Sequence, residues 1–178
     1  MIKALLIIFT LTFSLPGFAM PQSGETVTQR GIVNDDLYAA GGTVDIDAVV
    51  SGDVVAAGGD LFISNHIKGD VNVVGGSVHI RGDIQDDVRA AGGDITIDAN
   101  IGDDLIASGG RINVSAGSTV DGEVWLAGGD VLVAGTVNKD LVIGAGSIRL
   151  SGTVHGDVKL EGGEIQILEG AKIGRAHV

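Results

Sequence analysis

The sequence predicts an all-β protein built as a single β-solenoid of about eight stacked coils. Three observations lead to this prediction: a short internal period, columns of aliphatic residues at fixed places in that period, and a glycine content that disfavours helices. A fixed short period decides the architecture, because each repeat is one structural unit that buries its apolar face against its neighbours.

A pair of small residues marks the repeat. The first residues of successive pairs are 17 positions apart, except for one step of 19. The two extra residues lie within Ser115 to Thr119, between two intact columns, so we expect a bulged corner that leaves the stack unbroken. The pairs are Gly41-Gly42, Gly58-Gly59, Gly75-Gly76, Gly92-Gly93, Gly109-Gly110, Gly128-Gly129, Ala145-Gly146 and Gly162-Gly163.

Four positions of the repeat are aliphatic in every copy. In one copy these are Val54, Leu61, Ile63 and Ile67, and they alternate with more polar neighbours as in a strand with one buried face. β-Branched residues dominate the columns and favour strands, whereas each interior glycine destabilises a helix by about 1 kcal/mol relative to alanine. We expect short strands, with the glycine pairs at corners that need a positive φ or a close backbone approach.

The two ends of the chain do not follow the repeat. Residues 1–19 resemble a secretory signal peptide, with Lys3 before an apolar run and small residues before a cleavage point after Ala19. Residues 20–30 are polar and predict a linker, and residues 31–173 form the solenoid. Residues 174–178 read like a translated DNA sequencing adapter, so we expect a non-native tail on a truncated chain. These features predict an exported protein of the periplasm or cell envelope.

Composition excludes several classes of function. The net charge of −12 argues against binding to nucleic acid or to an anionic membrane surface. The absence of cysteine removes disulfides and thiol chemistry. With 44% hydrophobic but only 3% aromatic residues, the core must be filled by aliphatic side chains, which suits thin, regular layers.

One acidic residue precedes the first strand of each copy, and stacking would align these residues in a single row. Neighbouring charges about 5 Å apart repel by only about 1 kcal/mol in water, so we expect the carboxylates to be exposed or bound by backbone N–H groups or cations. The simplest expectation is that each side chain accepts hydrogen bonds from its own corner. A row of calcium sites is the alternative, although the sequence lacks a calcium-binding nonapeptide pattern. The row comprises Asp36, Asp53, Asp70, Asp87, Asp104, Glu123, Asp140 and Asp157.

No catalytic, cofactor-binding or metal-binding residues are predicted, and we expect no cofactor and no enzymatic activity. His66, His79 and His155 fall in three different columns, and no serine combines with a histidine and an acid at a matching corner. The glycine pairs precede no helix, so they are not phosphate-binding loops.

One outward-facing column suggests a contact surface. Ile106, Trp125 and Val142 become neighbours when the coils stack, and together with Ala127 they form an apolar strip that contains the only tryptophan. A contiguous apolar patch often marks a contact surface, so this strip predicts a lateral or partner contact.

The segments Gly52-Asp53-Val54, Ile67-Lys68-Gly69-Asp70-Val71 and Val154-His155-Gly156-Asp157-Val158 resemble the bactofilins, the polymer-forming cytoskeletal proteins of bacteria. The resemblance covers about Gly31 to Ile173. It implies a right-handed, three-sided β-helix whose ends stack into non-polar filaments without nucleotide, and a family without catalytic residues. Typical members are cytoplasmic, so the expected export implies a bactofilin-like domain in an envelope protein, with membrane attachment through a missing C-terminal region.

The function expected from the sequence is therefore a structural scaffold of the bacterial envelope. Its partners are other copies of the chain, stacked end to end, or envelope proteins. The alternatives are a carbohydrate-binding or adhesive β-helix and a hexapeptide-type acyltransferase. The acyltransferases repeat with 18 residues per coil, against 17 here, and an aromatic ladder for carbohydrate is not formed by the dispersed Tyr38, Phe62 and Trp125.

Overall fold

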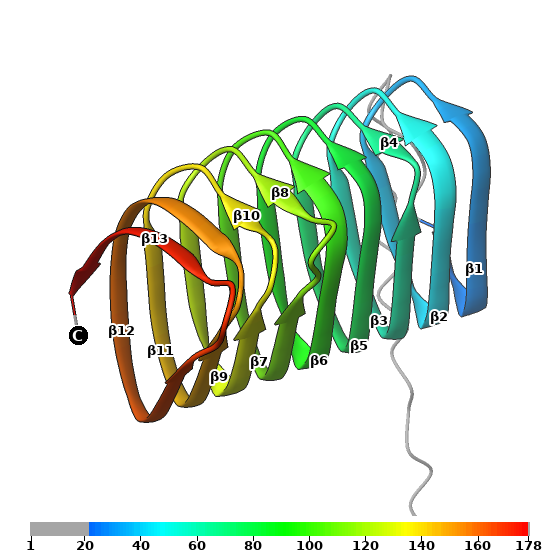
Figure 1. Ribbon diagram of the computed structural model, residues 1–178. Coiled ribbons are helices and arrows are strands. Elements are labelled where there is room, and N and C mark those ends of the chain that lie inside the picture. Colours follow the sequence, from blue (N-terminus) through cyan, green and yellow to red (C-terminus); the bar gives the residue numbers. More distant parts are fainter. Residues whose placement is uncertain (1–21, 178) are drawn as a thin grey trace, which may run out of the picture.

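The computed structural model describes residues 22–177, which form one continuous stack of parallel β-strands without a helix (Figure 1). Within this part of the chain, accordingly, no helix has the length and hydropathy needed to span a membrane. The expected signal peptide lies outside the described residues. The strands are β1 Gln22–Val33, β2 Leu37–Val50, β3 Val54–Ser64, β4 His66–Ile67, β5 Val71–Ile84, β6 Val88–Ile101, β7 Leu105–Val114, β8 Thr119–Val120, β9 Val124–Val133, β10 Thr136–Val137, β11 Leu141–Leu150, β12 Thr153–Ile167 and β13 Lys172–His177.

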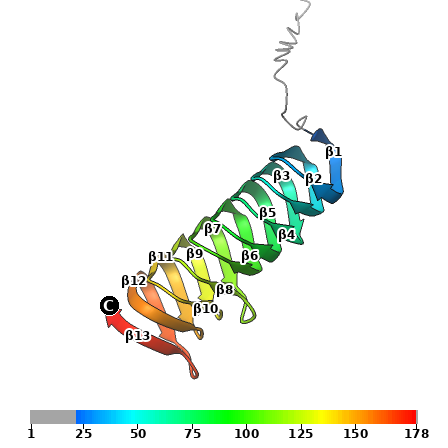
Figure 2. The ribbon, with the colours of Figure 1, turned by 90° about the horizontal axis from the view of Figure 1, so that it is seen from above.

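Each coil pairs with the coil that follows it 17 residues later. Leu37 lies opposite Val54, Val54 opposite Val71, and Val71 opposite Val88. Viewed from above, the coils make an elongated rod (Figure 2). This arrangement confirms the predicted all-β solenoid with a 17-residue period, and it contains about nine coils.

The additional coil corrects the linker expected over residues 20–30. From Gln22 onward this segment is strand β1, which pairs in parallel with β2 over its whole length. Gly24 lies opposite Gly41, and Val27 is buried opposite Val44. The segment looked unlike the repeat because its side chains are polar, whereas the pairing is made by backbone groups that any residue except proline supplies.

The glycine pairs bend the strands without ending them. A Cβ atom on Gly58 would lie 2.6 Å from the carbonyl oxygen of Gly41 in the preceding coil, closer than real side chains approach. A positive φ is not the reason, because the only described glycines with positive φ are Gly31, Gly82 and Gly170. Close approach between coils therefore selects glycine at this corner, and the strands are longer than the short ones expected.

The core is a narrow aliphatic column along the axis of the stack. The four predicted positions of the central coils are buried, with Val54, Leu61, Ile63 and Ile67 each at most 1% exposed. A further inward column of alanine and larger aliphatic residues runs beside them, as at Ala56. Burial of each large aliphatic side chain contributes about 1.5–3 kcal/mol relative to an exposed one, so the stack needs no aromatic residue.

The two-residue insertion forms the bulged corner that was expected. The Ser118 N–H donates to the Ser115 carbonyl at 3.0 Å, which closes a turn before β8. The buried Ser118 hydroxyl donates to the carbonyl of Ile97 at 2.9 Å and accepts from the N–H of Ala99 at 3.2 Å. β8 then pairs with Asn100 and Ile101 of the preceding coil, so the stack continues unbroken.

The last coil follows the stack less regularly. Ile173 lies opposite Val154, as the fourth column predicts, and is partly buried against the core. β13 continues from there to His177, with a register shift between Val154 and Asp157. Residues 175–177 thus pair with β12 through their backbone, and such parallel pairing requires no particular side chain.

Candidate functional site

The part of each coil between the acidic residue and the glycine pair has an outward surface that we call the groove face. Two positions per coil point outward there, and parallel register aligns them in two columns. The first column contains Tyr38, Val55, Asn72, Arg89, Ile106, Trp125, Val142 and Lys159. The second contains Ala40, Ala57, Val74, Ala91, Ser108, Ala127, Gly144 and Glu161.

A shallow groove of about 700 Å³ lies on this face and extends from the coil of β1 to that of β7. We call it the apolar groove. The alanines of the second column have short side chains, whereas Val55, Val74 and Ile106 stand 40%, 55% and 44% exposed. Its outward-facing lining residues are Tyr38, Ala40, Val55, Ala57, Asn72, Val74, Arg89, Ala91, Ile106 and Ser108, of which Arg89 is turned toward the acidic row by its two ion pairs.

The predicted apolar strip lies on the same face. Ile106 pairs with Trp125, and Trp125 pairs with Val142, so the three residues are neighbours as expected. Trp125 is 48% exposed. The sequence interpretation missed that the apolar surface continues through Ile106 into the groove, which it would have found by combining both outward columns.

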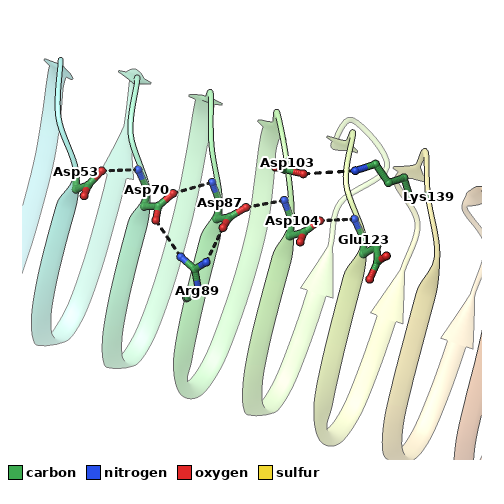
Figure 3. Close-up of polar contacts among 8 residues, drawn as sticks. All are labelled: Asp53, Asp70, Asp87, Arg89, Asp103, Asp104, Glu123 and Lys139. Atoms are coloured by element: carbon green, nitrogen blue, oxygen red, sulfur yellow. Dashed lines mark hydrogen bonds and ion pairs between the residues drawn. The ribbon is translucent and has the colours of Figure 1, made fainter.

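The acidic row borders the groove face along one edge (Figure 3). Most of its aspartates accept a hydrogen bond through Oδ1 from the backbone N–H of the next member of the row, with N···O distances of 2.7–3.1 Å. At Asp70, for example, the N–H donates to Asp53 Oδ1 at 2.9 Å and the carbonyl accepts from the N–H of Val54 at 2.8 Å. Each such corner is thus bound twice to the preceding coil.

This contact accounts for the glycine that precedes four members of the row, at Gly52, Gly69, Gly122 and Gly156. A Cβ atom on Gly69 would collide with Oδ1 of Asp53 and with the backbone of Gly52. Glycine leaves room for the carboxylate at these corners, whereas at Asp87 and Asp104 the same hydrogen bond forms after an aspartate. The expectation that each carboxylate accepts hydrogen bonds from its own corner is wrong, because the N–H donors belong to the following coil.

Glu123 is the exception within the row. Its longer side chain turns toward the groove face, where Oε2 accepts from Trp125 Nε1 at 3.1 Å. This hydrogen bond links the acidic row to the apolar strip.

Arg89 reaches from the groove face to the row and bridges two of its members. Its guanidinium nitrogens lie 3.0 Å from Asp70 Oδ2 and 2.5 Å from Asp87 Oδ2. The hydrogen bond to Asp70 is the main cause that raises the pKa of Arg89 above its ordinary value, and the neighbouring charges of both aspartates add to it. A cation on this face can therefore bind two successive carboxylates of the row.

Asp87, Asp103 and Asp104 bring carboxylate oxygens within 4.8 Å of one another. Protein donors already contact these groups: Arg89 pairs with Asp87, and Lys139 Nζ lies 3.6 Å from Asp103 Oδ1. The N–H of Glu123 donates to Asp104 at 2.7 Å. The arrangement is that of an acidic cluster balanced by its neighbours, and we assign no metal to it.

The described histidines contact residues of adjacent coils rather than one another. His79 stacks on Phe62 with ring centroids 5.3 Å apart. His66 Nε2 lies 3.1 Å from the side-chain nitrogen of Gln85, and His155 Nδ1 lies 2.9 Å from the side-chain oxygen of Asn138. No described histidine is paired with a serine and an acid, and His177 lies in the terminal strand.

No family model, curated protein or solved structure matches the chain. The candidate site is therefore defined by geometry alone, as an apolar groove with a row of carboxylates along its edge.

Proposed function

We propose that the chain is a non-catalytic scaffold of the bacterial cell envelope, similar to the bactofilins, which stacks end to end with other copies or holds envelope partners. The supporting observation is the in-register stacking of successive coils from β1 to β12. At the N-terminal end, β1 pairs with β2 but with no other strand of residues 22–177. Unpaired backbone groups along a strand edge invite the addition of another strand.

The side chains of β1 suit such an addition. Gln29 lies opposite the buried Ile46, so it belongs to an inward column but is only partly buried. Another coil stacked on β1 would cover this position. At the other end, Ile167 also belongs to an inward column and is 49% exposed. A coil placed beyond it, from the same protein or from another copy, would cover this apolar side chain.

Electron microscopy of the purified protein without nucleotide tests the proposal. We expect filaments, and we expect Gln29→Lys to abolish them, because stacking would bury the new charge without a partner. Thr28→Lys is the matched control, since the neighbouring Thr28 is exposed and faces outward. Monodisperse monomers of the unaltered protein at high concentration would contradict end-to-end stacking.

A further inference from the structure

We infer that the apolar groove and the acidic row together form a docking site for a cationic amphipathic helix of a partner protein. The inference deepens the proposed scaffold function, because it supplies the surface by which a partner is held. It does not require end-to-end stacking, so the two can fail separately.

The groove provides the apolar half of the site. It crosses the coils of β1 to β7, a distance of about 24 Å at about 4.8 Å per coil. A helix of about 16 residues has that length. Val55, Val74 and Ile106 line it, and each is at least 40% exposed. An apolar helix face laid along the groove would cover these side chains, as in other helix-in-groove complexes.

The acidic row provides the charged half. The members that accept a backbone N–H do so through Oδ1, and Oδ2 is the atom through which Asp70 and Asp87 bind Arg89. Asp36, Asp53 and Asp104 have no such cation in the described part of the chain, although the same backbone bonds hold their carboxylates in place. Arginine or lysine on a partner would therefore find fixed acceptors along one edge of the groove.

The spacing of the row favours a helix over an extended segment. Side chains along one edge of a helix recur once per turn, about every 5.4 Å, which is within about 0.6 Å of the coil spacing of about 4.8 Å. Alternate side chains of an extended chain are about 6.6 Å apart, so their charges would soon lose register with the row.

Charge also argues against two other occupants. A second copy of this chain would bring its own acidic row to the interface, and the net charge of −12 opposes such an approach. An anionic membrane surface would repel the row for the same reason. A cationic helix complements both halves of the site.

The test is fluorescence anisotropy of a labelled peptide of about 18 residues, made of leucine and lysine in an amphipathic helical pattern. We expect saturable binding that weakens with salt and exceeds that of a scrambled peptide of the same composition by about tenfold or more. Comparable binding of the two peptides would overturn the inference.

Variants locate the site. Val74→Glu, which places a charge in the groove, should weaken binding about tenfold. The double variant Asp53→Asn/Asp104→Asn should weaken it and reduce its salt dependence, while the amide oxygen still accepts the backbone N–H. Asp60→Asn/Asp98→Asn is the matched control, because both aspartates are exposed outside the groove face. Wild-type affinity in the Val74→Glu and row variants would refute the site.

The remaining outcomes are separated by two measurements. Analytical ultracentrifugation measures the oligomeric state. A dimer that the Val74→Glu substitution dissociates would show that the groove is a contact between copies of this chain, and would overturn the inference. Co-sedimentation of the protein with phosphatidylcholine vesicles that is lost in the Val74→Glu variant would show that the groove binds lipid. That result would also overturn the inference. Gln29→Lys, designed to prevent stacking, should bind the peptide normally, so that loss of filaments and loss of docking are distinguished.

Discussion

The central coils, from β3 to β11, and the two terminal coils use the same backbone pairing but differ in what they bury. In the central coils the inward columns are aliphatic and closed on both sides, as for Leu61, which has no exposed surface. In the terminal coils Val27 is the one buried side chain among residues 23–33 of β1, and Ile167 is half exposed. The comparison indicates that backbone pairing extends the stack, whereas side-chain burial gives it stability.

The largest difference in stability between substitutions in the central and the terminal coils is expected when inward-facing side chains are truncated. Leu61→Ala should lower the free energy of unfolding by about 2–5 kcal/mol, because it removes buried methyl groups and leaves a cavity. Ile167→Ala should lower it by about 1 kcal/mol or less, since half of that side chain is already in water. Urea denaturation followed by circular dichroism measures both, and equal losses would contradict the comparison.

A smaller difference is expected from added methyl groups at the glycine corner. Gly58→Ala should destabilise the protein by about 1–3 kcal/mol, because the new Cβ would lie 2.6 Å from the Gly41 carbonyl oxygen. Gly24→Ala in β1 places its Cβ at least 3.5 Å from its neighbours, and should be neutral or stabilise by up to about 1 kcal/mol. Thermal unfolding of the two variants provides the measurement. A stable Gly58→Ala protein would show that the coils can separate at this corner.

The smallest difference in stability between central and terminal coils is expected for substitutions in the acidic row. Asp53→Ala should cost about 1 kcal/mol, because the N–H of Asp70 loses its acceptor. Asp53→Asn should restore most of the loss, since its amide oxygen can accept the same bond. Asp157→Ala should change little, because no N–H of the described residues donates to its carboxylate. Calorimetry at neutral pH can rank the three, and a reversed order would show that repulsion along the row outweighs its hydrogen bonds.

The periodic part of the fold could be predicted because burial leaves a periodic mark on sequence. The aliphatic columns, the 17-residue step and the corner at Ser115 to Thr119 all follow from which positions face the axis. β1 could not be found in this way, because Gln29 replaces an aliphatic residue and Glu25 replaces the second glycine. Backbone pairing and the buried Val27 hold this segment, and backbone pairing has no sequence signature of its own.

The site was only partly predictable. Trp125 and its neighbours were found because large apolar residues in an outward column are unusual, but the groove depends on alanines whose importance lies in their small size. The row of carboxylates was evident from the period. The hydrogen bonds from the row to the next coil were not, because the direction of each Oδ1 depends on the corner geometry, which the period of the sequence does not specify.

The turn at Ala116-Gly117 has a consequence for how such a gene can change in length. Two added residues there leave β7, β8 and β9 in their places, because the turn bulges beside the stack. One residue added inside a strand would instead move each following side chain to the opposite face of the sheet, up to the next corner. Tolerated insertions should therefore concentrate at corners or comprise whole coils. The same turn is a natural place to attach a tag or label without disturbing either end of the rod.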